Sequence, residues 1–446
     1  MDPLALRTDG LLSVDDLRDL ATAGEIDTVI VGFCDMQGRL VGKRVSVRLF
    51  LDEVVEHGVE CSDYLLAVDV DMTTVDGYAL SSWGSGYGDL VLTPDMATLR
   101  LIPWLAGTAL VVADVSHHDG ASISVAPRTI LQAQVACLAE RSMVALAGTE
   151  LEFQVFDDGY REAYAKGYDD LTAASDHNID YSIGASSRME PLVRAIRLGM
   201  DGAGMYCEGS KGECNLGQQE IGFRYDEVTA TCDNHTIYKN GAKEIADQHG
   251  KSLTFMAKFD EREGNSCHIH LSLRATDGSP VFADAAGRHR MSPLFEHAIA
   301  GVLASMREFT LLFAPNINSY KRFARGSFAP TAVAWGIDNR TCAVRVVGDG
   351  ASMRMELRVL GGDVNPYLAV AGMIASSLDG IDRELPLGDP LAGSARMNIE
   401  VMPAVITVIR PTPDVRVLSP EPTVVTIWSV NHSASPNVAW SSGPAA

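Results

Sequence analysis

Charged side chains two residues apart recur in apolar, strand-like stretches of this sequence. Three such sets occur: Glu150 and Glu152; His268 and His270; and Arg354, Glu356 and Arg358. Alternate side chains of a strand point to the same face, so each set shares one face of its strand. Isolated charges are too costly to bury unless they pair or bind a metal. The pattern predicts a charged cavity suited to divalent metals and a phosphorylated substrate.

Two more carboxylates lie in the stretch 213–220. Glu213 and Glu220 are an odd number of residues apart, with Gly217 between them, and the glycine lets the backbone turn so that both acids face inward. The oxygen-rich set is then Glu150, Glu152, Glu213, Glu220, Glu356 and His268. It suits Mg²⁺ or Mn²⁺ rather than structural zinc. For any one of these residues alone, a surface ion pair is the simpler interpretation, but the joint pattern favours a metal site.

Several arginines lie in the same part of the chain: Arg322, Arg340, Arg345, Arg354 and Arg358. Guanidinium groups bind carboxylate and phosphate through two parallel hydrogen bonds. Arginines beside metal-binding acids fit phosphoryl transfer, which needs cations around the transferred group. The alternative is that the arginines only neutralise the glutamates. The sequence has no GxxxxGK[ST] loop, so any nucleotide is bound without a P-loop.

The first 115 residues are expected to form a small α+β domain. Ser13 and Asp16 form a capping box that opens a short helix, and Gly24 ends it. The stretches 26–34 and 39–47 are expected to pair as a hairpin. Further strands are expected at 64–71, 90–93, 98–102 and 110–114.

Beyond residue 115, helices and strands alternate. The pattern predicts a helix over 127–141 and a strand over 143–156. Asp233 is expected to cap a helix that runs through His249, before a strand over 252–259. The predicted fold class is α+β.

Composition limits the class of protein. The 446 residues are 46% hydrophobic, which indicates a globular chain of two or three domains. The net charge of −22 argues against nucleic acid and anionic membranes as partners. No apolar run reaches the roughly 18 residues of a membrane span, and the first residues do not resemble a signal peptide. The eight cysteines form no CxxC pair, which favours reduced thiols and a cytoplasmic location.

The last residues differ from the rest. Residues 396–446 contain seven of the 19 prolines, no lysine and no sustained helical or strand period. This composition favours a disordered or poorly packed tail. One hypothesis is that the tail is a frame-shifted reading of the end of the gene, which would remove helices that normally finish the fold.

Over residues 25–390 the chain resembles the type I branch of the glutamine synthetase family. The matching motifs are Gly148-Thr-Glu-Leu-Glu-Phe153, Glu213 with Gly217-Gln-Gln-Glu220, Phe255-Met-Ala-Lys258, Gly264-Asn-Ser-Cys-His-Ile-His-Leu-Ser272, Asn318-Ser-Tyr-Lys-Arg322, Asn339-Arg340 with Arg345, Arg354-Met-Glu-Leu-Arg358 and Asn365-Pro-Tyr367. The resemblance implies an N-terminal β-grasp domain over 15–115 and a catalytic domain over 116–395 built on a curved antiparallel sheet. The atypical tail follows at 396–446. It also implies stacked hexameric rings, a dodecamer, with each active site between two subunits.

The resemblance further implies roles for individual residues. One metal is assigned to Glu152, Glu213 and Glu220, and the second to Glu150, His268 and Glu356. Arg322, Arg358 and Gly264 are assigned to the glutamate substrate, and Arg340 and Arg345 to the transferred phosphoryl group. His270, Ser272 and Arg354 are assigned to ATP. The implied reaction forms γ-glutamyl phosphate and then a γ-glutamyl amide.

Two departures concern the acceptor side of that reaction. Ammonia-using glutamine synthetases carry a glutamate in a Pro-Gly-Tyr-Glu-Ala-Pro loop, whereas residues 325–330 here place Phe328 at that position. An aromatic ring cannot take a proton. The family's N-terminal Asp-Gly-Ser-Ser segment is also missing, and Asp63, Asp69 and Asp71 remain open as replacements.

Both departures predict an organic amine, such as ethanolamine or a polyamine, as the acceptor. The segments 61–71 and 176–181 are similar to the actinobacterial γ-glutamylethanolamide synthetase type. Two alternatives stay open: a glutamine synthetase that uses ammonia, and a non-catalytic structural or regulatory member of the family. Phe328 is counted among the candidate catalytic residues because it stands where the family has its acid.

Overall fold

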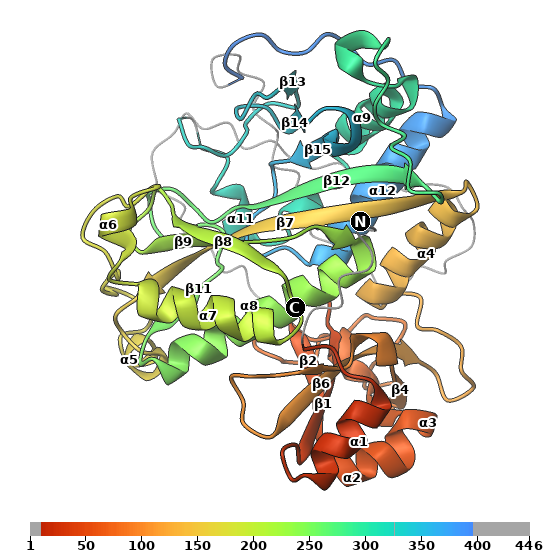
Figure 1. The fold of residues 1–446 in the computed structure, drawn as a ribbon, viewed down its shortest axis with the longest axis vertical. Coiled ribbons are helices and arrows are strands. Elements are labelled where there is room, and N and C mark those ends of the chain that lie inside the picture. The colour runs from red at the N-terminus through yellow and green to blue at the C-terminus, as the bar shows by residue number, and fades with distance from the viewer. Residues whose placement is uncertain (1–9, 325, 396–446) are drawn as a thin grey trace, which may run out of the picture.

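The computed structural model describes residues 10–324 and 326–395 (Figure 1). Its α-helices are α1 (Val14–Thr22), α2 (Val47–Leu49), α3 (Val55–His57), α4 (Pro127–Ala139), α5 (Tyr160–Ala165), α6 (Ile183–Ser186), α7 (Glu190–Gly202), α8 (Val228–Gln248), α9 (Pro293–Ser305), α10 (Thr310–Phe313), α11 (Ile317–Tyr320) and α12 (Pro366–Asp382). A π-helical turn, Phe50–Val54, joins α2 to α3. Short 3₁₀ helices span Asp63–Leu66, Met96–Thr98, Arg288–Arg290 and Gly350–Ser352.

The strands form two sheets. They are β1 (Thr28–Cys34), β2 (Leu40–Ser46), β3 (Val59–Ser62), β4 (Asp89–Pro94), β5 (Arg100–Leu101), β6 (Thr108–Ser116), β7 (Met143–Phe156), β8 (Cys207–Gly212), β9 (Gln218–Phe223), β10 (Asp226–Glu227), β11 (Ser252–Thr254), β12 (Cys267–Ala275), β13 (Trp335–Ile337), β14 (Val344–Val347) and β15 (Arg354–Leu357). With helices covering both sheets, the fold class is α+β, as predicted.

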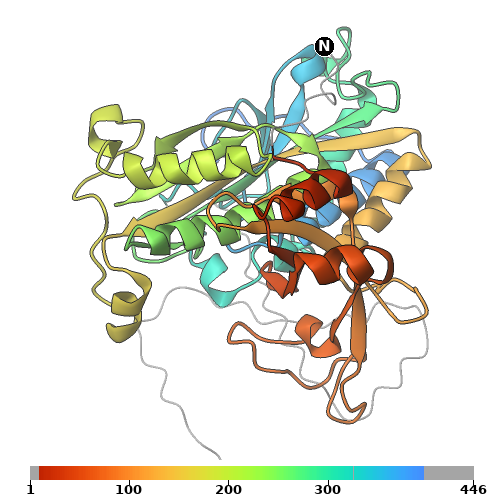
Figure 2. The same cartoon turned by 60° about the horizontal axis from the view of Figure 1, so that its bottom comes forward.

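The first sheet has the order β2-β1-β6-β4-β3, with β5 also paired to β6. The expected hairpin is present, because β1 pairs antiparallel with β2, while β1 and β6 run parallel. The capping box at Ser13 is also confirmed: Ser13 Oγ accepts from the Asp16 amide at 3.1 Å, and Asp16 Oδ2 accepts from the Ser13 amide at 2.8 Å. In Figure 2 this N-terminal part, red to orange, lies in front of the rest of the molecule.

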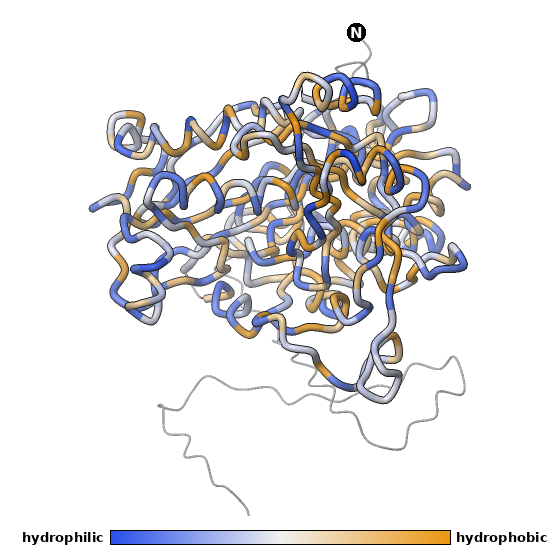
Figure 3. The backbone as a smooth tube through the Cα atoms, turned by 90° about the horizontal axis from the view of Figure 1, so that it is seen from below, coloured by the Kyte–Doolittle hydropathy of each residue, from blue (hydrophilic) through white to orange (hydrophobic). Residues whose placement is uncertain are grey.

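The first sheet is buried on both faces. Ala109, Val111 and Ala113 of β6 face a core shared with α1 and the helical turn after β2. Leu110 and Val112 face the opposite way and join the main core of the molecule. Figure 3 shows hydrophobic segments running through the interior. The two-residue period of β6 therefore divides one strand between two cores.

The second sheet has the order β13-β14-β15-β12-β7-β9-β8, and β10 and β11 also pair with β7. Its pairs are antiparallel except β13–β14. The long strand β7 has the predicted bounds, and β12 pairs with it over nine residues from Cys267 to Ala275. Helix α8 packs on β7 on the side away from Glu150, since Thr231 Oγ1 bonds the Ala147 carbonyl and His235 contacts Thr149.

Helix α12 packs against α9 and α4. Its crossing with α9 depends on two glycines. A Cβ atom on Gly301 would lie 2.0 Å from the Ser376 carbonyl oxygen and 2.8 Å from the Gly380 Cα atom. A larger residue at either glycine would push the two helices apart.

Three local predictions differ from the structure. The strand expected at 64–71 is wrong: Asp63–Leu66 forms a 3₁₀ helix, because the Asp63 carboxylate accepts hydrogen bonds from Ser81 Oγ and the Gly88 amide. The strand expected at 252–259 ends at Thr254, where Asn265 Nδ2 bonds the Thr254 carbonyl at 3.2 Å.

The predicted helix cap at Asp233 is also wrong. Helix α8 begins earlier, and its N-cap is Glu227, whose side chain accepts from the Thr229 and Ala230 amides. Asp233 is 1% exposed and binds Arg128 of α4 through both carboxylate oxygens, at 3.0 and 3.1 Å. A partner 105 residues away has therefore determined the role of this aspartate.

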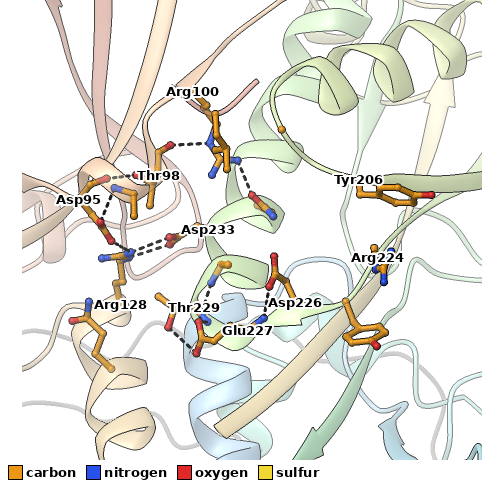
Figure 4. Close-up of a pocket in the computed structure, with 17 residues that line it drawn as sticks. Asp95, Thr98, Arg100, Arg128, Tyr206, Arg224, Asp226, Glu227, Thr229 and Asp233 are labelled. Atoms are coloured by element: carbon orange, nitrogen blue, oxygen red, sulfur yellow. Dashed lines mark hydrogen bonds and ion pairs between the residues drawn. The ribbon is translucent and has the colours of Figure 1, made fainter. Parts of the chain in front are cut away.

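Arg128 also joins the first sheet to the helices. It donates to Asp114 at 2.6 Å and to Asp95 at 2.7 Å, in addition to Asp233. Nearby, Arg100 of β5 donates to Asn234 of α8 at 2.6 Å. A cavity of about 430 Å³ at the junction is lined by Asp95, Arg100, Arg128, Asp233 and Asn234, among others (Figure 4). None of the predicted site residues lies in its lining.

The division into domains at residue 115 stays a prediction. None of the helices in the described chain is long and apolar enough to cross a membrane. The tail over 396–446, with the frame-shift hypothesis, lies outside the described residues.

Candidate active site

Strand pairing places the predicted acids and histidines beside one another on one face of the second sheet. Glu150 of β7 is directly opposite His268 of β12, and Glu152 is opposite Glu220 of β9. One step further across the sheet, His270 of β12 is opposite Glu356 of β15. The spacing of two residues within each strand keeps them on the same face.

The first cluster contains Glu150, His268 and Glu356, each offering a ligand atom within 4.8 Å of the others. His268 Nδ1 lies 3.4 Å from Glu150 Oε2 and 3.5 Å from Glu356 Oε1. His270 supports this cluster. Its Nδ1 accepts from Arg354 Nε at 3.1 Å, so its Nε2 carries the proton that it donates to Glu150 Oε1 at 3.0 Å.

The second cluster contains Glu152, Glu213 and Glu220, again within 4.8 Å. Gly217, with φ +68°, makes the turn between β8 and β9 that brings the last two together, as the sequence predicted. Lys211 of β8 contacts Glu213, and its Nζ lies 3.6 Å from Glu220 Oε1. Glu152 Oε2 accepts from the Ser266 amide at 2.7 Å.

The pKa values of the clustered acids depend on burial and on the positively charged groups nearby. Burial raises the pKa of Glu220 to about 7, although Lys211 opposes the shift. Burial would also raise the pKa of Glu150 and of Glu356, but the neighbouring histidines, and Arg358 at Glu356, hold both below the usual range. Burial, with Arg358 nearby, lowers the pKa of His268, so its neutral imidazole is available as a ligand.

The arginines lie around Glu356 and the adjoining loops. Glu356 is fully buried and accepts from Arg345 at 2.9 Å and from Arg358. Arg322 is 4% exposed, and one of its terminal nitrogens donates to the Leu360 carbonyl at 2.6 Å. Arg340 is exposed, and its carbonyl oxygen accepts from Arg358 Nε at 3.1 Å.

A cavity of about 630 Å³ lies over these groups. The predicted site residues in its lining are Glu150, Glu152, Glu213, Glu220, Gly264, His268, Arg322, Phe328, Arg340, Arg345 and Arg358. Four predicted residues are outside that lining: Glu356, His270, Ser272 and Arg354. Glu356 is buried beneath His268, while the other three continue along β12 and β15.

Nine lining residues were not predicted as site residues, and four of these are charged or aromatic: Lys211, Asp180, Tyr181 and Glu263. Lys211 is two residues before Glu213. The same two-residue spacing that identified the acids therefore identifies this lysine. Glu263 directly precedes Gly264, and Asp180 precedes Tyr181 in a stretch without strand or helix period. Of these positions, only Lys211 carries a signal in its spacing.

Divalent metals fit both clusters. Three carboxylates, or two carboxylates and one imidazole, are the hard donor sets that Mg²⁺ and Mn²⁺ prefer. Glu220 is a carboxyl group whose pKa is raised by burial and by the neighbouring acids Glu150 and Glu152, and a cation bound there would favour its ionised form. The residues present therefore suit two such ions.

The comparisons identify the class. Residues 124–404 match the glutamine synthetase catalytic domain. This chain belongs to the glutamine synthetase family. It is 58% identical over 393 residues to the γ-glutamylethanolamide synthetase of Streptomyces coelicolor, covering 88% of this chain and 84% of that protein.

Two other relatives are named for organic amines. The glutamate–isopropylamine ligase of a Pseudomonas species is 35% identical, covering 85% of this chain and 83% of that protein. The γ-glutamylputrescine synthetase of Escherichia coli is 32% identical, covering 81% and 77%. Among solved structures, ligand-free GmaS superimposes with a TM-score of 0.74 at 27% identity, covering 86% of both chains. The family predicted from the motifs is confirmed.

Proposed function

We propose that this protein is an ATP-dependent ligase that joins the γ-carboxyl group of glutamate to an organic amine, with ethanolamine as the leading acceptor. The observation that carries the proposal is the pair of acid clusters, ringed by arginines, in a chain 58% identical to a protein named γ-glutamylethanolamide synthetase. A polyamine is the other organic acceptor to test.

The reaction has two steps. A carboxylate is a poor acyl donor, so a γ-carboxylate oxygen of glutamate first attacks the γ-phosphorus of ATP, and ADP leaves. The amine nitrogen then attacks the γ-carbonyl carbon, inorganic phosphate leaves, and the nitrogen loses a proton. The first step brings two anions together, which requires positive charge and fixed orientation.

The acid clusters would hold the divalent ions, one at Glu152, Glu213 and Glu220, the other at Glu150, His268 and Glu356. When bound, Mg²⁺ or Mn²⁺ supplies positive charge that neutralises the phosphate oxygens. His270, by donating to Glu150, fixes the orientation of that ligand.

The arginines are assigned to the anionic groups of the substrates. Arg322 and Arg358, with Gly264, are proposed to bind glutamate, since both guanidinium groups line the cavity and are held by backbone carbonyls. Arg340 and Arg345 are proposed to stabilise the transferred phosphoryl group.

His270, Ser272 and Arg354 are proposed to bind the nucleotide, because they extend the same face along β12 and β15 beyond the cavity. At Phe328, which is 54% exposed, the cavity has an apolar ring instead of an acid. This favours an amine with a carbon chain.

We also propose that the protein forms stacked hexameric rings in the cytoplasm. Segment 70–83 of the N-terminal part carries exposed apolar side chains, namely Val70, Met72, Tyr78 and Trp83, which mark a contact surface. All eight cysteines are free thiols, as expected in a reducing compartment.

Phosphate release from ATP tests the function. The purified protein is incubated with glutamate, Mg²⁺ and, in turn, ethanolamine, putrescine, spermidine or ammonia, and products are identified by mass spectrometry. We expect the γ-glutamyl amide of an organic amine. Activity with ammonia alone would refute the acceptor assignment, and no release with any acceptor would favour a non-catalytic role.

A further inference from the structure

We propose that the carboxylate of Glu263 binds the cationic amine group of the acceptor. This would supply the anion that the loop at 325–330 lacks. The inference deepens the proposed function and rests on it.

Buried amides hold the backbone of Glu263 in place. Asn215 Nδ2 donates to the Glu263 carbonyl oxygen at 2.6 Å, and Gln218 Nε2 donates to the Gly264 carbonyl oxygen at 3.1 Å. Asn215 and Gln218 are each 1% exposed. The turn between β8 and β9, which also carries Glu213 of the second acid cluster, therefore fixes the position of Glu263 relative to that cluster.

The side chain of Glu263 reaches the residue that replaces the family acid. Glu263 Oε2 accepts a hydrogen bond from the Phe328 backbone amide at 3.1 Å, and both residues line the cavity. In the described part of the chain, no donor bonds Glu263 Oε1. One carboxylate oxygen thus anchors the loop, while the other is available to a ligand.

Among the described residues, no lysine or arginine forms an ion pair with Glu263. Lys211 is paired with Glu213, and Arg345 with Glu356. Asp180 lies in the same lining and accepts from the Cys214 thiol at 3.3 Å. Within the part of the chain that the structure describes, Glu263 and Asp180 thus line the cavity without an ion-pair partner, and a cationic ligand would supply one.

A primary alkylammonium ion matches these surroundings. Its N–H groups can donate to Glu263 Oε1, and a hydrogen bond between two charged groups is stronger than one between neutral groups. Its carbon chain can contact the exposed ring of Phe328. Ammonium has the charge without the chain, so the pair of residues favours an organic amine.

The test is Glu263→Gln in the full-length protein. Glu263 is only half-buried, so the variant is expected to fold. The KM for ethanolamine, or for whichever organic amine the wild type uses, should rise about 10- to 100-fold, the cost of losing a charged hydrogen-bond partner. Hydroxylamine is uncharged at neutral pH, so its KM should change by less than about threefold. Glu263→Asp should restore part of the affinity. Glu261→Gln, an exposed acid on the same loop, is the matched control and should behave as the wild type.

The outcomes separate this inference from the proposed function. If wild-type protein couples glutamate to no organic amine, the proposed function fails. If the wild type is active and Glu263→Gln leaves the KM for the alkylamine unchanged, only the role of Glu263 fails. Equal losses with hydroxylamine and the alkylamine would also overturn the inference, because they indicate a structural role.

Discussion

Replacing Lys211 by methionine tests whether the cluster around Glu220 is a cation site. Lys211 contacts Glu213 and lies 3.6 Å from Glu220, and the side chains of Lys211, Glu213 and Glu220 are 24%, 14% and 12% exposed. Without the lysine, Glu152, Glu213 and Glu220 would share a largely buried pocket with no cation nearby. The folded state should lose stability unless a divalent ion takes the place of the ammonium group.

The distance gives the size of the effect. At an effective dielectric constant of about 20, two unit charges 3.6 Å apart attract by roughly 4–5 kcal/mol. Desolvation and partial exposure reduce the net contribution to about 2–3 kcal/mol. In a protein of this size, such a loss lowers the Tm by a few degrees.

Thermal unfolding in EDTA and in saturating Mg²⁺ measures this loss of stability. We expect Lys211→Met to unfold at a lower temperature than wild type in EDTA and to recover most of the difference in Mg²⁺. The matched control is Lys251→Met, which removes a lysine paired with Asp157 at 2.5 Å outside the cavity. An equal Tm difference with and without Mg²⁺ would refute the assignment of this cluster to a metal.

Three further predictions concern single residues. Glu356→Ala should lower turnover at least about 10³-fold and destabilise the fold by about 3–5 kcal/mol, because it leaves the buried Arg358 and the half-buried Arg345 without their shared carboxylate. Circular dichroism and phosphate release measure the two effects, and near-normal turnover would show that Glu356 holds no metal. Phe328→Glu should raise kcat/KM for ammonia relative to ethanolamine by about 10-fold or more, and an unchanged ratio would remove Phe328 as the selector. Burial lowers the pKa of His235 to about 3, so the unfolded chain takes up a proton at this residue below about pH 6.5 while the folded protein does not. Folding stability should therefore fall between about pH 6.5 and 3, by at most about 5 kcal/mol from this residue, and His235→Gln should lose less stability than wild type in urea titrations across that range.

The site was predictable where its residues follow a local period. Glu150 and Glu152 are two residues apart in one strand and so share a face, and antiparallel pairing places His268 opposite Glu150. Gly217 marked the turn because only a residue without a side chain adopts its backbone angle easily. The two-residue spacing and the glycine can each be found within a few residues of sequence, whereas the pairing of Glu150 with His268 joins residues 118 positions apart.

The missed features depend on contacts between distant segments. Asp233 has the chemistry of a helix cap, but it binds Arg128 instead and is one of three aspartates around that arginine. Glu263 is one acid in a polar loop, and its relation to Phe328 appears only when residues 65 positions apart meet. A local pattern carries no information about such partners.

The Arg128 network bears on how the protein can be divided. Strand β6 supplies side chains to two cores, so a fragment that begins after residue 116 would expose the apolar surface on which Leu110 packs. The same fragment would lack Asp95 and Asp114, which are two of the three carboxylates that bind the buried guanidinium group of Arg128. The N-terminal part and the remainder of the described chain should therefore unfold together in one cooperative transition. A truncation at that point would yield an aggregation-prone species rather than an autonomous catalytic module.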